Sequence, residues 1–475
     1  LLANTTGAEN VAVGKEALES NTTASGNTAI GYRAAEETTT GALNTVVGGN
    51  AFEANTTGGS NVAIGHSALD ANTTADSNTA VGTYSLTANT IGSENVAVGY
   101  QALVANVSGD RSTAIGYNAL TSQNNGTSTY DANNTAVGYG SMASVTTGTR
   151  NVALGSGSLG AADDDGRSVA VGFNALATMN TGNSSPYNVA VGYNAGTAIT
   201  TGTLNTVVGG LALVNSTIGR YNTALGYAAL TTDVDGDFST AVGYQALATQ
   251  ESDSANQTVY NTALGAYAGN GLTTGIRNTL LGGFAGGNAA ITGDYNVAVG
   301  YSALYDNTSG AHNTGIGSDA LGNNTTAADN VAVGSSALYT NTTGASNVAV
   351  GRSALSANTT GTENVAVGYT SLVANTTGSY NTAVGTDSMS ANTTGQENVS
   401  MGWNSLDANT TGGTNVAIGA SSLGSNTTAS NNTAVGYNSL ALNTTGTGNT
   451  AVGQGAGAAV TTGDNNTIVG KLAGD

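Results

Sequence analysis

A tandem repeat with a period of 17 residues constrains this chain more than any other feature. An Asn or Ser is followed by Val or Thr, a mostly small residue, an aliphatic residue and Gly, and this motif occurs in 27 copies. The copies begin at positions 10, 27, 44, 61, 78, 95, 112, 134, 151, 168, 188, 205, 222, 239, 261, 278, 296, 313, 330, 347, 364, 381, 398, 415, 432, 449 and 466. Of the 26 intervals, 22 are 17 residues long, and the others are 22, 20, 22 and 18 residues long, after Ser112, Ser168, Ser239 and Asn278. A fixed short period predicts one elongated array over residues 1–475.

The repeat is described here by columns, numbered from 0 at the leading Asn or Ser. Columns 1 and 3 are aliphatic or β-branched and flank a small residue in column 2, which predicts a short strand that ends at the Gly of column 4. Column 8 is usually Leu and predicts a second short buried segment. Columns 11 to 14 read Asn-Thr-Thr-Gly, with the Gly placed for a turn of positive φ. Two short segments and two turns per repeat form one coil of a parallel β-solenoid.

An exchange between columns shows which side chains share the interior. Where column 8 is Gly, at Gly196, Gly269 and Gly457, column 11 changes from Asn to an aliphatic residue. Because a close-packed interior conserves volume, columns 8 and 11 must lie on the same side of the coil wall. We expect columns 3, 8 and 11 to line the core, and the Asn residues of columns 0 and 11 to stack into amide ladders.

The same pattern excludes a helical solenoid, because helix pairs need periods above about 30 residues. A coil this thin buries little apolar area by itself, and the small residues of column 2 invite close approach of a neighbouring chain. We therefore expect a homotrimer. Leu1 falls in the column of Leu18, and Asp475 stops about halfway through the last copy, so we expect the sequence to be an excerpt of a longer chain.

Composition narrows the classes of partner. The chain has 9 Lys and Arg against 29 Asp and Glu, a net charge of −20, which disfavours nucleic acid and anionic lipid as partners. It has no Cys, so a disulfide framework and a thiolate metal site are both excluded. No apolar run reaches the roughly 18 residues that a membrane span requires.

Columns 0 to 4, as in Asn10–Gly14, Asn61–Gly65 and Ser168–Gly172, resemble the repeated Ser-Val-Ala-Ile-Gly segments of YadA-type head domains in trimeric autotransporter adhesins. The longer unit, with its Asn-Thr-Thr-Gly, is similar to repeats of phage-type tail fibres. The resemblance implies a left-handed, trimeric β-roll that attaches to surfaces or host cells. The repeat here is longer than the usual head repeat of about 14 residues.

Three interval changes mark candidate binding loops. The coils that begin with Ser each follow an acidic turn and carry an inserted loop, at Thr121–Asn133, Ala177–Tyr187 and Ala248–Tyr260. Insertions in stacked repeats project from one face, often the binding face. The hypothesis is that these loops contact a receptor or glycan; the alternative is that they are tolerated surface elaborations. The candidate ligand-binding residues are Asn124, Tyr130, Tyr187, Asn256 and Tyr260.

Two acidic clusters provide a candidate Ca²⁺ site. Their carboxylates come from Asp163, Asp164 and Asp165, and from Asp233, Asp235 and Asp237. The spacing Asp-Val-Asp-Gly-Asp begins like a calcium loop but lacks the bidentate Glu. The alternative is that these residues are solvated or cap backbone amides. No other cofactor is expected.

Column 5 carries an aromatic stripe, and a thinner stripe precedes the leading Asn. The column 5 aromatics are Tyr32, Tyr100, Tyr117, Tyr139, Phe173, Tyr193, Tyr227, Tyr244, Tyr301, Tyr369, Trp403 and Tyr437. Such rings either stack on sugars or brace turns and fill a groove between chains. The Asn-Thr-Thr tripeptides also match the N-glycosylation pattern, although turn formation explains them as well.

An enzyme is not expected. The chain has only His66 and His312 and shows no phosphate-binding loop or paired nucleophile and base. The sequence therefore favours an extracellular fibrous adhesin at the cell surface, with two alternatives: a phage or phage-like tail fibre for host recognition, and a structural surface filament without a dedicated ligand.

Overall fold

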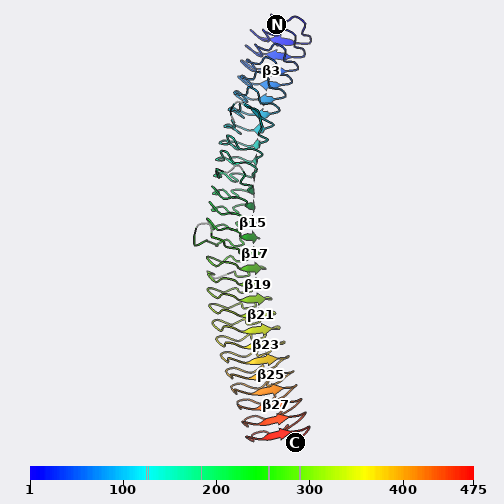
Figure 1. Cartoon of the computed structure of the whole chain (residues 1–475), viewed down its shortest axis with the longest axis vertical. Helices are drawn as coiled ribbons and strands as arrows, with labels where there is room; N and C mark the ends of the chain where they lie inside the picture. Colours follow the sequence, from blue (N-terminus) through cyan, green and yellow to red (C-terminus); the bar gives the residue numbers. More distant parts are fainter. Residues whose placement is uncertain (125, 127, 183–184, 255–256, 288–289, 475) are drawn as a thin grey trace. The chain divides into compact units, whose positions relative to one another are not determined.

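A computed structural model describes residues 1–124, 126, 128–182, 185–254, 257–287 and 290–474. These residues form two compact units, one of Leu1–Phe238 with Ser254–Gln257 and one of Ser239–Asp253 with Thr258–Asp475. Both units are stacks of coils, and in each the strands lie along one side of the stack (Figure 1). The described residues contain no helix, and therefore none that could cross a membrane.

Each of the 27 repeats contributes one three-residue strand at columns 1 to 3, so the predicted parallel β-solenoid with a 17-residue period is confirmed. The strands of the first unit are β1 (Val11–Val13), β2 (Thr28–Ile30), β3 (Thr45–Val47), β4 (Val62–Ile64), β5 (Thr79–Val81), β6 (Val96–Val98), β7 (Gly109–Asp110), β8 (Thr113–Ile115), β9 (Tyr130–Asp131), β10 (Thr135–Val137), β11 (Val152–Leu154), β12 (Val169–Val171), β13 (Val189–Val191), β14 (Thr206–Val208) and β15 (Thr223–Leu225). Those of the second unit are β16 (Thr240–Val242), β17 (Thr262–Leu264), β18 (Thr279–Leu281), β19 (Val297–Val299), β20 (Thr314–Ile316), β21 (Val331–Val333), β22 (Val348–Val350), β23 (Val365–Val367), β24 (Thr382–Val384), β25 (Val399–Met401), β26 (Val416–Ile418), β27 (Thr433–Val435), β28 (Thr450–Val452) and β29 (Thr467–Val469).

Within each unit, equivalent columns of successive coils pair in parallel. Val348, Ala349 and Val350 of β22, for example, stand opposite Val365, Ala366 and Val367 of β23. The two-residue strands β7 and β9 lie outside this ladder and pair with each other.

The interior holds column 2 and not column 3, which corrects one expectation. Ala349 and Ala366 are fully buried, whereas Val350 is exposed. Alternation along a strand does not tell which face points inward. Here the Leu of column 8 and two Asn side chains occupy the interior, and only a small residue fits beside them. Column 2 is therefore closed off inside its own chain and does not provide the close approach to a neighbour that we expected.

The second buried segment forms, but as turns rather than a strand. Columns 6, 8 and 16 adopt left-handed backbone even though they are not Gly; in one coil Gln101, Leu103 and Arg111 have φ of 54°, 53° and 59°. The segment is still bonded to the next coil, since the Leu103 N–H donates to the Ala119 carbonyl at 3.0 Å. Leu103 is fully buried, as predicted for column 8.

The glycines of columns 4 and 14 serve different purposes. Gly48, in column 4, has φ of 147°, and a Cβ there would lie 2.3 Å from the Gly65 carbonyl oxygen of the next coil. Gly361, in column 14, does not have the positive φ that we expected. A Cβ on Gly361 would meet the Gly378 carbonyl oxygen at 2.3 Å, so this Gly permits close stacking of coils rather than a left-handed turn.

Both predicted Asn ladders form, inside the coil wall. In column 11, Asn375 Nδ2 donates to Asn358 Oδ1 at 2.9 Å and also to the Gly378 carbonyl at 2.9 Å. In column 0, the Asn381 N–H donates to Asn364 Oδ1 at 3.0 Å, and Asn381 Nδ2 donates to the Gly395 carbonyl at 2.9 Å. These bonds satisfy polar groups that a thin apolar core would otherwise bury without partners.

The exchange between columns 8 and 11 is confirmed as shared packing. A Cβ on Gly196 would lie 2.9 Å from the Ile199 Cδ1 and 3.1 Å from the Leu176 Cδ2. At Gly457 the nearest atoms come from Ile468, Leu440 and Val460. The aliphatic residue of column 11 therefore helps to fill the space that the missing Leu leaves.

Candidate binding surfaces

The three inserted loops leave their coils directly after column 11, and a change inside the coil accompanies each one. Column 11 holds Gln123, Met179 and Gln250 in these coils, instead of Asn. Gln123 reaches across the interior: its Nε2 donates to Asn106 Oδ1 at 3.1 Å, and its Oε1 accepts bonds from Ser112 Oγ at 3.1 Å and Asn134 Nδ2 at 3.0 Å. Gln250 likewise bonds to Ser239 and Asn261.

This exchange explains both the leading Ser and the insertion. The long side chain of column 11 occupies space that an Asn in column 0 would need, so a shorter Ser stands there. In an ordinary coil the Asn of column 11 also closes the turn, as Asn55 does when its Oδ1 accepts the Gly58 N–H at 3.0 Å and its Nδ2 donates to the Gly58 carbonyl at 3.1 Å. An inward-pointing Gln or Met cannot do this, and the chain leaves the coil as a loop. The pairing of Ser with Gln or Met is visible in the sequence, but sequence reasoning missed it.

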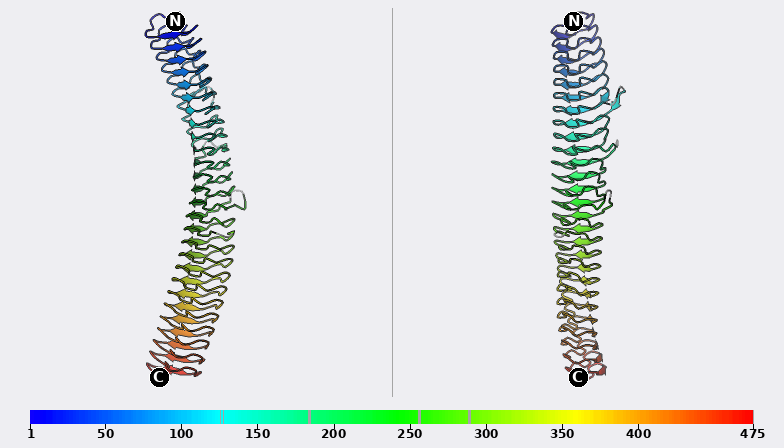
Figure 2. Two further views of the ribbon diagram at one scale, coloured as in Figure 1. Left: turned by 180° about the vertical axis from the view of Figure 1, so that it is seen from behind. Right: turned by 90° about the vertical axis from the view of Figure 1, so that its left-hand side faces the viewer.

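The first loop is anchored at its return and exposed at its start (Figure 2). Tyr130 and Asp131 pair with Gly109 and Asp110, and Arg111 Nη1 contacts Asp131 Oδ1 at 2.5 Å. Burial raises the pKa of Tyr130 to about 12, and its buried hydroxyl lacks a hydrogen-bond partner among the described residues. Asn124 is exposed and only its backbone N–H is tied to a neighbouring coil, to the Thr146 carbonyl at 3.0 Å. Of these two candidates, the structure makes Asn124 the accessible one.

The second and third loops present tyrosines. Tyr187 and Tyr260 are both about half exposed, at 49% and 50%. The Arg167 guanidinium lies 5.8 Å from the centre of the Tyr187 ring. Asn256 lies outside the described residues. None of these placements tests whether the loops bind a ligand, which stays a prediction.

The acidic residues form hydrogen bonds rather than one cluster. Asp165 accepts the Thr181 N–H at 2.9 Å, Asp233 accepts the Gly236 N–H at 3.1 Å, and Asp237 accepts the Arg220 N–H at 2.7 Å. Asp163 accepts a bond from the Thr146 hydroxyl, while Asp164 is exposed and Asp235 is half-buried. Among the residues that the structure describes, no three His, Asp or Glu side chains are arranged to hold a metal ion.

Asp237 belongs to a recurring device. Asp residues in column 15 accept the backbone N–H of column 15 in the preceding coil, as Asp110 does from Ser93 at 2.7 Å and Asp294 does from Ile276 at 2.8 Å. The capping role therefore accounts for Asp165, Asp233 and Asp237 by themselves. Ca²⁺ binding stays an untested prediction.

The aromatic stripe of column 5 is exposed, and several of its rings stack on one another. The centres of Tyr100 and Tyr117 lie 5.2 Å apart with an interplanar angle of 16°, and those of Tyr117 and Tyr139 lie 5.3 Å apart at 8°. Stacked rings cover each other's faces and present their edges to solvent. The inner rings of this stripe therefore have little free face for a sugar.

The Asn-Thr-Thr tripeptides are internal on their Asn side. Asn341 and Asn409 are fully buried, and both amide nitrogens donate two hydrogen bonds. An acceptor nitrogen must be accessible for glycosylation, so the folded coil withholds these sites.

The outward face of the main sheet is apolar, and sequence reasoning assigned part of it to the core. Column 3 side chains that are exposed by more than a third include Ile30, Ile115, Leu225, Leu264, Leu281, Ile316, Met401 and Ile418. A continuous aliphatic face of this kind on a soluble protein marks an interaction surface.

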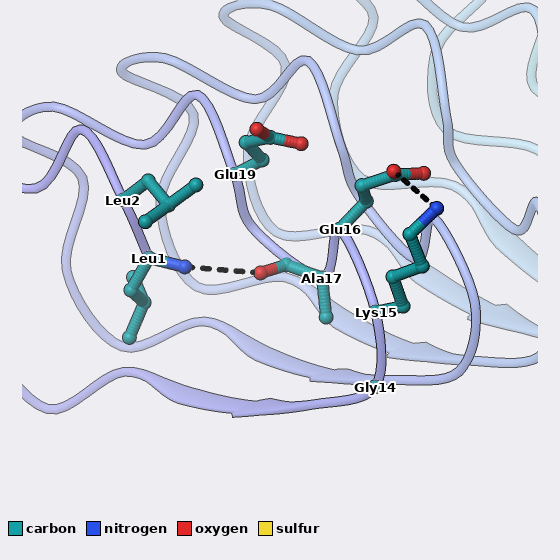
Figure 3. Close-up of a pocket in the computed structure, with 7 residues that line it drawn as sticks. All are labelled: Leu1, Leu2, Gly14, Lys15, Glu16, Ala17 and Glu19. Atoms are coloured by element: carbon teal, nitrogen blue, oxygen red, sulfur yellow. Dashed lines mark hydrogen bonds and ion pairs between the residues drawn. The ribbon is translucent and has the colours of Figure 1, made fainter.

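The described residues do not assemble a catalytic site. His66 packs edge-on against Tyr84 with ring centres 5.7 Å apart, and His312 stacks on Tyr295 at 5.0 Å. A hollow of about 350 Å³ beside Leu1 and Lys15 (Figure 3) contains one ion pair, between Lys15 Nζ and Glu16 Oε1 at 2.9 Å, and one bond from the Leu1 amino group to the Ala17 carbonyl. No group in it pairs a nucleophile with a base.

Comparison with protein families identifies two copies of the YadA head domain repeat in this chain. The matched residues are 96–119 and 108–128 in the first copy region, and 223–246 and 235–255 in the second. Both regions include the beginning of a loop-bearing coil, those of Ser112 and Ser239. No curated protein was found to match the chain.

Proposed function

We propose that this chain is the repeat region of a trimeric, surface-exposed adhesin. The carrying observation is the exposed aliphatic face of columns 1 and 3, which runs over the coils of each unit and includes Ile115, Leu264 and Ile418. The YadA head repeats support the same assignment, because the adhesins that this chain resembles are trimeric. A single chain leaves this face in water, whereas three chains packed through it bury the face.

The oligomeric state tests the first half of the proposal. We expect the purified chain to sediment at three times its chain mass of 46.2 kDa. The double variant Val350→Glu with Ile418→Glu places two carboxylates on the aliphatic face, and we expect it to sediment as a monomer with an unchanged circular dichroism spectrum. The matched control, Thr360→Glu with Thr428→Glu, adds the same charges to exposed positions of the same coils and should remain a trimer. A monomeric wild type contradicts the proposal.

Adhesion tests the second half. The loops are best removed by restoring the ordinary coil, which requires both ends of the exchange: Ser112→Asn with Asn-Thr-Thr-Gly-Ala-Ser in place of residues 123–133, and the same changes at Ser168 with 179–187 and Ser239 with 250–260. We expect wild type to bind cultured cells or immobilised mucin, and the triple replacement to lose most of that binding while its melting temperature stays equal or rises. Equal adhesion of the two proteins would place binding outside the loops.

The Ca²⁺ prediction has its own measurement. If the acidic turns hold Ca²⁺, the melting temperature of the chain falls when a chelator is added. Coincident melting curves with and without chelator show that the hydrogen bonds of Asp165, Asp233 and Asp237 suffice.

A further inference from the structure

The second unit contains a small hollow that is formed by two tyrosines of the same column. Column 9 is Tyr in only two coils, at Tyr305 and Tyr339, and the coil between them has Gly322 in that column. Ser302, Tyr305, Asp319, Gly322, Asn323 and Tyr339 line a hollow of about 200 Å³ in the coils that follow β19, β20 and β21 (Figure 1). We call this hollow the tyrosine slot.

The slot exists because Gly322 has no side chain. A Cβ there would lie 2.9 Å from Tyr339 Cε2 and 3.0 Å from Tyr339 Cδ2, so the Tyr339 ring rests directly against the Gly322 backbone. Tyr305 is held from its other side by Phe284, whose ring centre lies 6.4 Å away at an interplanar angle of 64°. The two rings are two coils apart, about 10 Å along the stack, and both are fixed by contacts to neighbouring coils.

The floor of the slot is rigid. The Asn323 N–H donates to the Tyr339 carbonyl at 3.0 Å, the Asp306 N–H donates to the Gly322 carbonyl at 2.9 Å, and the Gly322 N–H donates to the Asp319 carbonyl at 3.2 Å. A preorganised floor lowers the entropy that a ligand must overcome on binding.

Polar groups at the rim are available to a ligand. The Ser318 hydroxyl donates to Asp319 Oδ2 at 2.9 Å and orients this carboxylate. The hydroxyls of Ser302, Tyr305 and Tyr339 and the side-chain amide of Asn323 form no hydrogen bond with the described residues. The slot therefore offers both donors and acceptors between two rigid aromatic rings.

We propose that the tyrosine slot binds one neutral hexose unit of a glycan. Aromatic rings with a few convergent polar groups are the usual composition of small-ligand sites, and a hexose has apolar C–H faces for the rings and hydroxyls for both kinds of polar group. Asp319 and the net charge of −20 disfavour an acidic sugar. A cationic group would suit the rings and the carboxylate, but it would leave the donors of Ser302 and Asn323 unused.

This slot differs from the stripe of column 5. Inner rings of that stripe stack face to face, whereas Tyr305 and Tyr339 are separated by the coil of Gly322. The role of the slot in attachment rests on the proposed adhesin function, but binding of a sugar does not depend on trimer formation or on the loops. The two proposals can therefore fail separately.

Saturation-transfer NMR on the full chain tests the slot, with the methyl glycosides of glucose, galactose and mannose as probes and choline as the alternative probe. A single shallow site for a hexose should have a Kd on the order of 1 mM. We expect transfer to at least one glycoside, and at least roughly tenfold weaker binding in Tyr305→Ala and in Tyr339→Ala. Tyr339→Phe keeps the ring and should retain most of the binding.

Two further variants separate binding from folding. Gly322→Val fills the slot and leaves both rings in the chain, so it should abolish transfer while the melting curve stays cooperative. Tyr380→Ala removes an exposed Tyr of the same unit and should bind as wild type does. The proposal is overturned if no glycoside shows transfer, if transfer is equal in wild type and Gly322→Val, or if choline alone binds.

Discussion

At the scale of single residues, the interior is decided by which side chains can share one small volume. Leu in column 8, Ala in column 2 and Asn in columns 0 and 11 fill each ordinary coil, and changes in one column are matched by changes in another. Ile199 next to Gly196 and Gln123 next to Ser112 show this for apolar and polar pairs. The amide ladders make the cost of a mismatch high, because they leave buried donors without acceptors. Asn443 Oδ1, which precedes Val460 in the ladder, is one such orphaned atom.

A double-mutant cycle measures this sharing. Gly196→Leu drives a side chain into Ile199 and should cost about 1–3 kcal/mol of unfolding free energy through overpacking. Ile199→Asn alone leaves a partly empty interior and should also destabilise. Because each change makes room for the other, the double variant should lose at least about 1 kcal/mol less than the sum of the single losses in urea unfolding. Additive losses would contradict the shared volume.

Asp70 gives a prediction for pH. Burial raises the pKa of this half-buried carboxyl, an effect that His66 and Arg33 only partly oppose. The folded state therefore holds the proton more tightly than the unfolded state, and stability is lost as pH rises from the ordinary carboxyl range through the raised pKa. Asp70→Asn should stabilise the chain at pH 7 and have little effect at pH values where Asp70 is protonated in both states.

Thermal melting of wild type and Asp70→Asn between acidic and neutral pH provides the measurement. Asp164→Asn, which changes an exposed carboxylate, is the control for the loss of one negative charge. A stabilisation by Asp70→Asn that is equal at all pH values would show that burial of the ionised carboxyl is not its cause.

At the scale of the coil, stacking depends on glycines whose carbonyls lie where a Cβ would be. Gly48 and Gly49 form a matched pair for this point. Gly48 combines φ of 147° with a 2.3 Å approach to the next coil, whereas a Cβ on Gly49 would meet no atom within 4 Å.

We expect Gly48→Ala to destabilise the chain by at least about 1–3 kcal/mol, because its backbone conformation is nearly restricted to Gly and its Cβ collides with backbone. Gly49→Ala should be neutral or stabilise by up to about 1 kcal/mol through the unfolded state. Urea unfolding of both variants and wild type distinguishes the positions; similar losses for the two would refute the role of close stacking.

Much of the coil could be predicted from the sequence, and the failures have physical causes. The period predicted the strands, and the exchange at Gly196 and Ile199 predicted the shared interior. The choice between columns 2 and 3 depends on the interior volume, which no local pattern contains. The left-handed backbone at Leu103 and Arg111 was missed because neither residue favours it, and only bonding to adjacent coils holds it there. The loops were located by length, but their link to Gln123 and Gln250 appears only when the two ladders are seen to meet.

At the scale of the whole molecule, the chain combines a net charge of −20 with an apolar sheet face. The charge keeps chains apart in general, while the face favours one specific mode of association. Most of the core could be inferred without the structure, but the outward face could not, because its residues look like core residues in the sequence. That the two units behave as one continuous array stays a prediction, as does the handedness of the coils.

The constant offset between hydrogen-bonded partners also bears on how such a gene changes. Asn358, Asn375 and Asn392 are bonded across intervals of 17 residues, so removing or duplicating one whole repeat joins equivalent partners again. A deletion of one codon inside a repeat instead shifts both ladders and the strand register together. Length variants in natural populations should therefore differ by whole repeats, produced by recombination between near-identical copies, and the coils of Ser112, Ser168 and Ser239 mark the places where an insertion was accommodated by a change in its own coil.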